Sequence, residues 1–143
     1  METELKSGLE YVFEYIVKDD ETVPNLFKQA EELKQMPKVL ASAYMIGLVE
    51  WACIQLINKH INWPSEQSVG TGFNLSHIAA TPVGFKVSIK VVLEKVEGRK
   101  LTFNVEVSDQ HEVISKGTHE RFIINPDKFN IALEKKISAE KHS

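Results

Sequence analysis

Two ionisable side chains stand in segments that are otherwise apolar. Glu50 lies in the least polar part of the sequence, the run MIGLVEWAC that begins at Met45. His77 lies between Leu75 and Ala79 in a segment whose apolar residues alternate. Burying an unpaired carboxylate costs free energy, so a buried glutamate usually has a shifted pKa or a specific partner. A carboxylate and an imidazole that meet could act as nucleophile or general base and as proton shuttle.

Each of these residues also has a structural interpretation. Glu50 could be an ion-paired or capping residue at a helix edge, and a lone histidine in apolar surroundings is more often a hydrogen-bonded core residue. Ser42, eight residues before Glu50, is most simply a helix cap or a small packing residue. Eight residues span about 12 Å of helix, so the two side chains cannot touch within one straight helix. They could cooperate only if Ser42 lies in a bent start of the helix or if two subunits contribute.

A further charged group lies near the end of the sequence. Gly117, His119 and Arg121 share one face of the last predicted strand. We expect an edge strand here, on which charged side chains are usually solvated. Alternatively, Arg121 could bind an anionic group such as a CoA phosphate or the carboxylate of an acyl product. The single cysteine, Cys53, is expected to be a small buried helix residue, because apolar surroundings raise the pKa of a thiol.

The elements that position these residues follow from hydrophobic periodicity. Apolar residues at every second position from Leu9 to Val17 predict a strand. From 38 to about 59, just after Pro37, the spacing changes to three and four residues, which predicts a long helix. Its middle is almost uncharged, so we expect it to be buried on more than one side. We assign to one face of this helix Leu40, Tyr44, Gly47, Leu48, Trp51, Ala52 and Gln55.

The second half of the chain is predicted to contain four more strands. They cover residues 70–80, 87–93, 101–107 and 113–124, and turn residues separate them. An antiparallel sheet has one face that must be covered, so we expect the sheet to curl around the long helix. That is the α+β hot-dog architecture. Because such units usually pair with the active site between two helices, we expect a homodimer or a higher oligomer.

The remaining segments and the composition set the limits of the prediction. Residues 1–143 fit one domain, with a loop over 22–37 that holds one short helix at 25–33. The tail after Asn125, polar from about 131, is expected to fray. The net charge of −3 gives no basic footprint for nucleic acid, and no apolar run reaches the roughly 20 residues that cross a bilayer. The N-terminus lacks the pattern of a secretory signal, so we expect a cytoplasmic protein, without a cysteine-based metal site.

Five blocks of the sequence, in their order and spacing, resemble the fluoroacetyl-CoA thioesterase family. They are residues 42–53, 68–71, 77–82, 96–99 and 117–121, and the similarity extends over roughly 9 to 130. The resemblance implies a hydroxyl–Glu–His triad, which falls on Ser42, Glu50 and His77. It also implies that the Gly70 N–H donates to the thioester oxygen and that Arg121 helps to order the site.

The chain departs from the family's pattern in two respects. The family usually has threonine at position 42, and serine keeps the hydroxyl but is less restrained at χ1. Leu33 and Met36 occupy the positions at which the fluoroacetate-resistance enzymes cover the acyl pocket with a phenylalanine pair. We therefore expect a short- or medium-chain acyl-CoA rather than fluoroacetyl-CoA as the substrate.

The implied reaction is thioester hydrolysis. Glu50 either attacks the carbonyl to give a mixed anhydride or activates water, His77 shuttles protons, and the Gly70 N–H stabilises the oxyanion. No metal or cofactor is expected, since coenzyme A is part of the substrate. Two other functions remain open: a non-catalytic hot-dog domain that binds an acyl-CoA or a small ligand, and a hydratase-type hot-dog enzyme.

Overall fold

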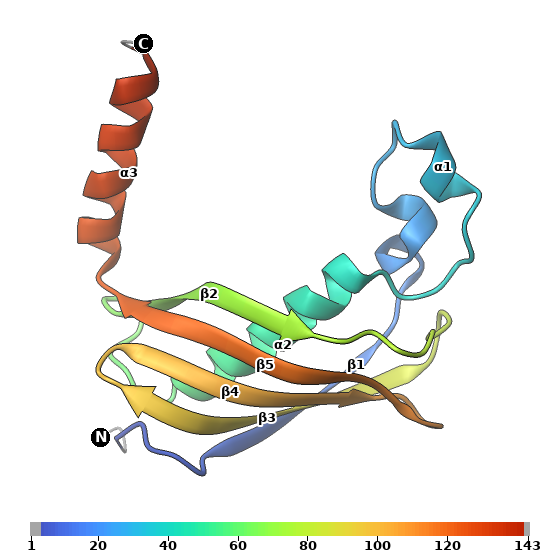
Figure 1. Cartoon of the computed structure of the whole chain (residues 1–143), viewed down its shortest axis with the longest axis horizontal. Helices are drawn as coiled ribbons and strands as arrows, with labels where there is room; N and C mark the ends of the chain where they lie inside the picture. The colour runs from blue at the N-terminus through green and yellow to red at the C-terminus, as the bar shows by residue number, and fades with distance from the viewer. Residues whose placement is uncertain (1–3, 142–143) are drawn as a thin grey trace.

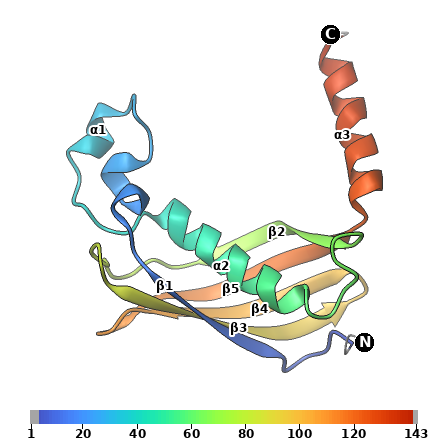
Figure 2. The ribbon, with the colours of Figure 1, turned by 180° about the vertical axis from the view of Figure 1, so that it is seen from behind.

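The computed structural model describes residues 4–141 and contains one antiparallel sheet. Its strands lie in the order β1-β3-β4-β5-β2, and helix α2 (Ser42–Ile57) runs along one face of the sheet (Figures 1 and 2). This arrangement confirms the predicted α+β hot-dog fold. The strands are β1 (Glu10–Ile16), β2 (Gln67–Leu75), β3 (Lys86–Glu97), β4 (Lys100–Ser108) and β5 (Val113–Ile124).

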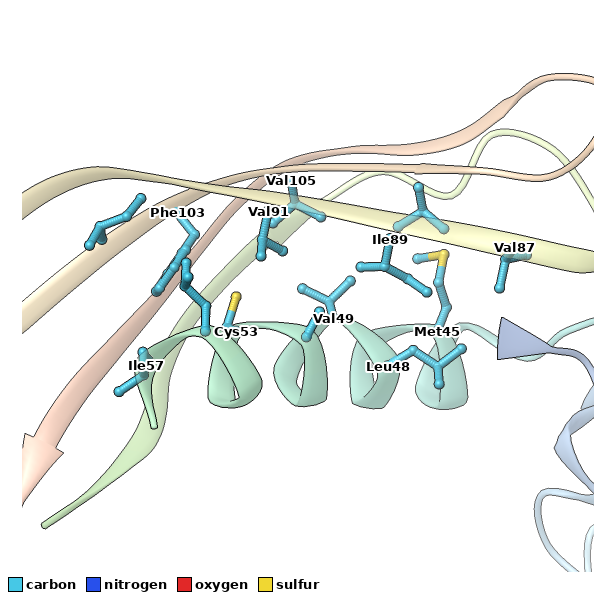
Figure 3. Close-up of a cluster of buried hydrophobic side chains, with 14 of the residues drawn as sticks. Met45, Leu48, Val49, Cys53, Ile57, Val87, Ile89, Val91, Phe103 and Val105 are labelled. Atoms are coloured by element: carbon cyan, nitrogen blue, oxygen red, sulfur yellow. The ribbon is translucent and has the colours of Figure 1, made fainter. Parts of the chain in front are cut away.

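Most of the core lies between α2 and strands β3 and β4 (Figure 3). Alternate residues of β3 and β4 point toward the helix, and cross-strand pairs such as Val91 with Val105 and Leu93 with Phe103 bring them together. Burying each such side chain contributes roughly 1.5–3 kcal/mol. The buried members of the two strands are Val87, Ile89, Val91, Leu93, Leu101, Phe103, Val105 and Val107.

Helix α2 begins later than predicted, and its buried residues overlap only in part with the predicted face. Residues 38–41 are extended, and isolated bridges join Val39 to Pro82 and Leu40 to Thr22. Of the residues assigned to one helix face, Leu48 and Ala52 are buried, whereas Tyr44 and Trp51 are 40% and 49% exposed. Because the helix is apolar on nearly all sides, its periodicity does not determine which side meets the sheet. The buried helix residues are Met45, Leu48, Val49, Ala52, Cys53, Leu56 and Ile57.

Two other segments also differ from expectation. The helical turn α1 lies at Glu31–Lys34, preceded by the 3-10 turns η1 (Asp19–Glu21) and η2 (Val23–Asn25), instead of at 25–33. The segment after Asn125 is not frayed: it forms α3 (Pro126–Lys141), which projects from the sheet with no buried residue (Figure 1). This helix carries acidic and basic residues beside four exposed large apolar side chains, Phe129, Ile131, Leu133 and Ile137. Within residues 4–141, no helix has the length and apolar character needed to cross a membrane.

Candidate active site

Strand β5 is an interior strand, so the expectation that it lies at the edge is wrong. It pairs with β4 on one side and with β2 on the other. Close approach of the two strands depends on Gly117, where a Cβ atom would lie 1.9 Å from the carbonyl oxygen of Asn74. As a result Arg121, which we expected to be solvated, has a side chain that is only 3% exposed.

The Arg121 guanidinium is surrounded by acceptors. Its Nε donates to Ser68 Oγ at 2.8 Å and its Nη2 donates to the Ser68 carbonyl at 2.8 Å. Nη1 lies 3.0 Å from Glu50 Oε2 and 3.1 Å from His119 Nε2. A buried charge with these partners is compensated, whereas loss of a hydrogen-bond acceptor would leave it expensive to bury. Glu50 therefore has the ion pair that its structural interpretation requires, yet its side chain stays 36% exposed.

Gly70 lies directly against this carboxylate. A Cβ atom at Gly70 would come within 2.7 Å of Glu50 Oε2, 3.2 Å of Phe73 Cζ and 3.3 Å of His119 Cε1. The pairing of β2 with β5 shifts register between Gly70 and Gly72, and such bulges are common beside active sites. A side chain at position 70 would therefore push the Glu50 carboxylate away from the place where Arg121 holds it.

Ser42 and His77 form a second group at the N-terminal end of α2. Ser42 Oγ lies 2.7 Å from His77 Nδ1. Ser42 is the first residue of the helix and makes no cap, because Ala41 occupies the N-cap position. The prediction that His77 lies on a strand is wrong: it follows the end of β2 at Leu75, in a segment where the N–H groups of Ser76 and Ile78 still donate to Lys116 and Ile114 of β5. If the Ser42 hydroxyl donates to Nδ1, the neutral imidazole carries its proton on Nε2.

Burial gives His77 a distinctive proton affinity. Desolvation lowers the pKa of the imidazole below its ordinary 6.5, because burial disfavours the charged form. Nε2 of the same ring is buried and has no hydrogen-bond partner among the described residues. His77 is thus a neutral group at pH 7 with one nitrogen available to a further partner.

Within one copy of the chain, two of the three predicted triad residues are in contact and the third is not. Ser42 and His77 are hydrogen-bonded, while Glu50 lies two helical turns further along α2, with Arg121 and Gly70. Eight residues of helix correspond to about 12 Å. Among residues 4–141, no hydrogen bond joins Glu50 to either of the other two.

A cavity of about 310 Å³ opens beside the Ser42–His77 pair. Its apolar walls come from Val23, Val39, Leu40, Ile78, Ala79 and Ala80. Leu33 and Met36 do not line this cavity, and Met36 is 48% exposed. Val23 and Val39 were not predicted to line a site, because Val23 lies inside the predicted loop and Val39 in the predicted helix. His119 was predicted only to share a strand face with Arg121, with no role assigned.

The family model of the fluoroacetyl-CoA-specific thioesterases matches residues 17–127. The chain belongs to this family. It is 35% identical over 139 residues to the fluoroacetyl-CoA thioesterase of Streptantibioticus cattleyicolor, covering 97% of this chain and 99% of that protein. Membership in the family makes this chain a thioester hydrolase, and it confirms the resemblance inferred from the five sequence blocks.

Solved structures agree with this assignment. The fluoroacetyl-CoA thioesterase FlK superposes with a TM-score of 0.90 at 35% identity, covering 94% of this chain and 98% of that one. A threonine-to-serine variant of the same enzyme, solved with acetyl-CoA, gives 0.88 at 36% identity over 92% and 98% of the two chains. A thioesterase superfamily member from Thermus thermophilus gives 0.84 at 24% identity over 96% and 97%, which supports the fold alone.

Proposed function

We propose that this enzyme hydrolyses short- or medium-chain acyl-CoA to the free acid and CoA, with Ser42, Glu50 and His77 as its catalytic groups. The observation that carries the proposal is the placement of the Glu50 carboxylate. Buried Arg121 holds one of its oxygens at 3.0 Å, and a Cβ atom at Gly70 would come within 2.7 Å of the same oxygen. Acyl transfer needs a group for attack and a donor for the oxyanion; Gly70, whose N–H the family resemblance assigns to the oxyanion, lies beside this carboxylate.

Two routes are compatible with this placement. In the first, a Glu50 oxygen bonds to the acyl carbon, the carbon–sulfur bond breaks, and CoA leaves as a thiolate. Water then attacks the mixed anhydride and releases Glu50, while neutral His77 takes a proton from that water and passes it to the CoA thiolate. In the second, Glu50 takes a proton from water, the resulting hydroxide bonds to the acyl carbon, and the carbon–sulfur bond breaks; the proton passes from Glu50 through His77 to the thiolate. In both, the Gly70 N–H stabilises the oxyanion, and no metal or cofactor takes part beyond the CoA of the substrate.

His77 and Ser42 supply the proton transfer. Because burial keeps the imidazole neutral at pH 7, it can take up a proton and return it to the leaving thiolate. The Ser42 hydroxyl at 2.7 Å orients the ring, which is a smaller contribution than bond formation. The adjoining cavity of about 310 Å³ has walls of valine, leucine, isoleucine and alanine. These walls favour an apolar acyl group over a polar one.

We propose further that a second copy of the chain completes the site. The midpoint between Ser42 and Glu50 is Ile46, so an antiparallel pairing of two α2 helices about that point places Ser42 and His77 beside Glu50 of the partner subunit. The outward face of α2 suits such a contact. Tyr44 and Trp51 are large and exposed there, and at Gly47 nothing lies within 4 Å of the position of a Cβ atom.

The activity is tested with a panel of acyl-CoA thioesters and a free-thiol readout. We expect steady release of CoA from acetyl-, propionyl- and butyryl-CoA. Measurable acyl-CoA binding without thiol release would instead indicate a ligand-binding domain. Hydration of an enoyl-CoA without CoA release would indicate a hydratase.

The shared site is tested by light scattering and by complementation. The particle mass should be at least twice 16.2 kDa. The inactive variants His77→Ala and Glu50→Gln, mixed in equal amounts and allowed to exchange subunits, should recover about a quarter of wild-type activity, because half the dimers are mixed and each has one intact site. A stable, fully active monomer, or a mixture that stays inactive after exchange, would exclude the shared site.

A further inference from the structure

His119 is a fully buried histidine with a partner on each ring nitrogen. It lies on β5, is 0% exposed, and its ring stacks on Phe73 with centroids 4.4 Å apart and an interplanar angle of 19°. Nδ1 is 2.8 Å from the Gly72 carbonyl oxygen, and Nε2 is 3.1 Å from Arg121 Nη1. The imidazole therefore joins strand β2 to the arginine that holds Glu50.

The two partners determine where the imidazole proton lies. A carbonyl oxygen only accepts a hydrogen bond and a guanidinium only donates. Nδ1 must therefore carry the hydrogen, and Nε2 must accept from Arg121 with its lone pair. His119 is neutral in this arrangement, since a proton on Nε2 would face an N–H of Arg121.

The charges around the ring agree with a neutral form. Burial lowers the pKa of His119 below 6.5, and the Arg121 charge lowers it further. The Gly72 hydrogen bond and the carboxylates of Glu50 and Glu120 act in the opposite direction, and the net shift is downward.

The hydrogen bond to His119 limits what Arg121 gives to Glu50. An arginine beside a carboxylate often forms a two-pronged pair that occupies both carboxylate oxygens. Here Nε and Nη2 donate to Ser68, and Nη1 divides its two hydrogens between His119 and Glu50. Arg121 is bonded to Glu50 Oε2 alone, which leaves Oε1 to react.

We propose that His119 is a positioning residue for the thioesterase reaction: by accepting from Nη1, it holds Arg121 to a single hydrogen bond with Glu50. This inference rests on the proposed role of Glu50 as nucleophile or base. Without the acceptor, the guanidinium can turn its Nη1 hydrogens toward the carboxylate and occupy the oxygen that reacts. The effect falls on the chemical step and not on the binding of CoA.

Two substitutions separate this role from packing. His119→Phe keeps a flat ring against Phe73 but removes both hydrogen bonds. His119→Gln places an amide oxygen where Nε2 accepts from Arg121. We expect kcat of the Phe variant to be at least tenfold below that of wild type, with KM changed less than threefold. The kcat of the Gln variant should be at least threefold above that of the Phe variant. Val91→Ala, a core change without contact to Arg121 or its partners, is the control for general destabilisation.

Some outcomes would overturn the proposal. A folded Phe variant with wild-type kcat would do so, as would equal losses of kcat in the Phe, Gln and Val91→Ala variants at equal melting temperatures. Nitrogen NMR of the wild-type protein gives an independent readout: His119 should be the neutral Nδ1–H tautomer at pH 7, and an imidazolium or an Nε2–H tautomer contradicts the inference. If wild-type protein hydrolyses no thioester, the proposed function fails, while the tautomer measurement still decides the hydrogen bonding of His119.

Discussion

Replacing Glu50 by glutamine separates a catalytic from a structural carboxylate. The substitution keeps the size and shape of the side chain, and the amide oxygen can still accept from Arg121 Nη1, now 3.0 Å from Oε2. What is lost is the charge. A hydrogen bond to a charged group contributes roughly 1.5–3 kcal/mol and a neutral one about 0.5–1.5 kcal/mol, so the loss of stability should be about 1 kcal/mol.

That figure is reduced because Glu50 is 36% exposed and solvent screens the pair. The melting temperature should therefore fall by roughly 2–4 °C at most, with CoA binding retained. The effect on turnover should be much larger. A variant that lacks the nucleophile or base loses on the order of a hundredfold or more in kcat, about 3 kcal/mol of transition-state stabilisation.

The assay is kcat by thiol release, measured beside the melting temperature and the affinity for CoA. Glu120→Gln is the matched control, because it makes the same substitution at the residue before Arg121. The Glu120 side chain is 39% exposed and pairs with Lys100 at 3.7 Å. That control should keep kcat within about twofold of wild type. Near-wild-type turnover of a normally folded Glu50→Gln variant would refute the mechanism at this site.

Four other expectations follow from the same geometry. His77→Ala should lower kcat by about a hundredfold or more and Ser42→Ala by less, because a shuttle contributes more than the hydroxyl that orients it; an equal loss contradicts the division of roles. With Leu33 and Met36 in place of an aromatic pair, kcat/KM for fluoroacetyl-CoA should exceed that for acetyl-CoA by less than roughly a thousandfold, or ~4 kcal/mol; a larger ratio shows that the lid argument is wrong. Activity should fall in acid with a midpoint below pH 6.5, since the lowered pKa of His77 keeps the imidazole neutral above that value; a midpoint above 6.5 in the profile of kcat/KM against pH is the contrary result. Gly70→Ala should reduce kcat at least tenfold, because its methyl group would lie 2.7 Å from the reacting carboxylate; a fully active variant would show that the backbone does not need this approach.

The strands were predictable because their apolar residues alternate without interruption. In β3 and β4 every second residue from Val87 to Leu93 and from Leu101 to Val107 is buried, and Gly98 with φ of 64° supplies the turn between the strands. Glu50 could also be identified from the sequence, because a carboxylate is unusual in the middle of an apolar helix.

What depends on strand order could not be predicted from local pattern. Alternation assigns Arg121 to one face of its strand. It does not predict that β2 pairs with β5 and that Arg121 is thereby buried. His77 was assigned to a strand because Leu75 and Ala79 continue the alternation, although β2 ends at Leu75 and the following residues bond to β5 less regularly, through Ser76 and Ile78. The partners of His119 belong to β2 and to the neighbouring residue Arg121, so only the assembled sheet reveals its hydrogen bonds.

Helix α2 carries Ser42 and Glu50 to two separate anchors, a loop histidine for the first and a strand arginine for the second. Because both residues are held in place, the number of helix residues between Ser42 and Glu50 is fixed. Insertion of one residue between the two would rotate one end of the helix by about 100° relative to the other, so that one side chain or the other would lose its anchor. Insertions and deletions should therefore be tolerated in the turns and in the segment before the helix, but be absent from the eight-residue interval of active relatives.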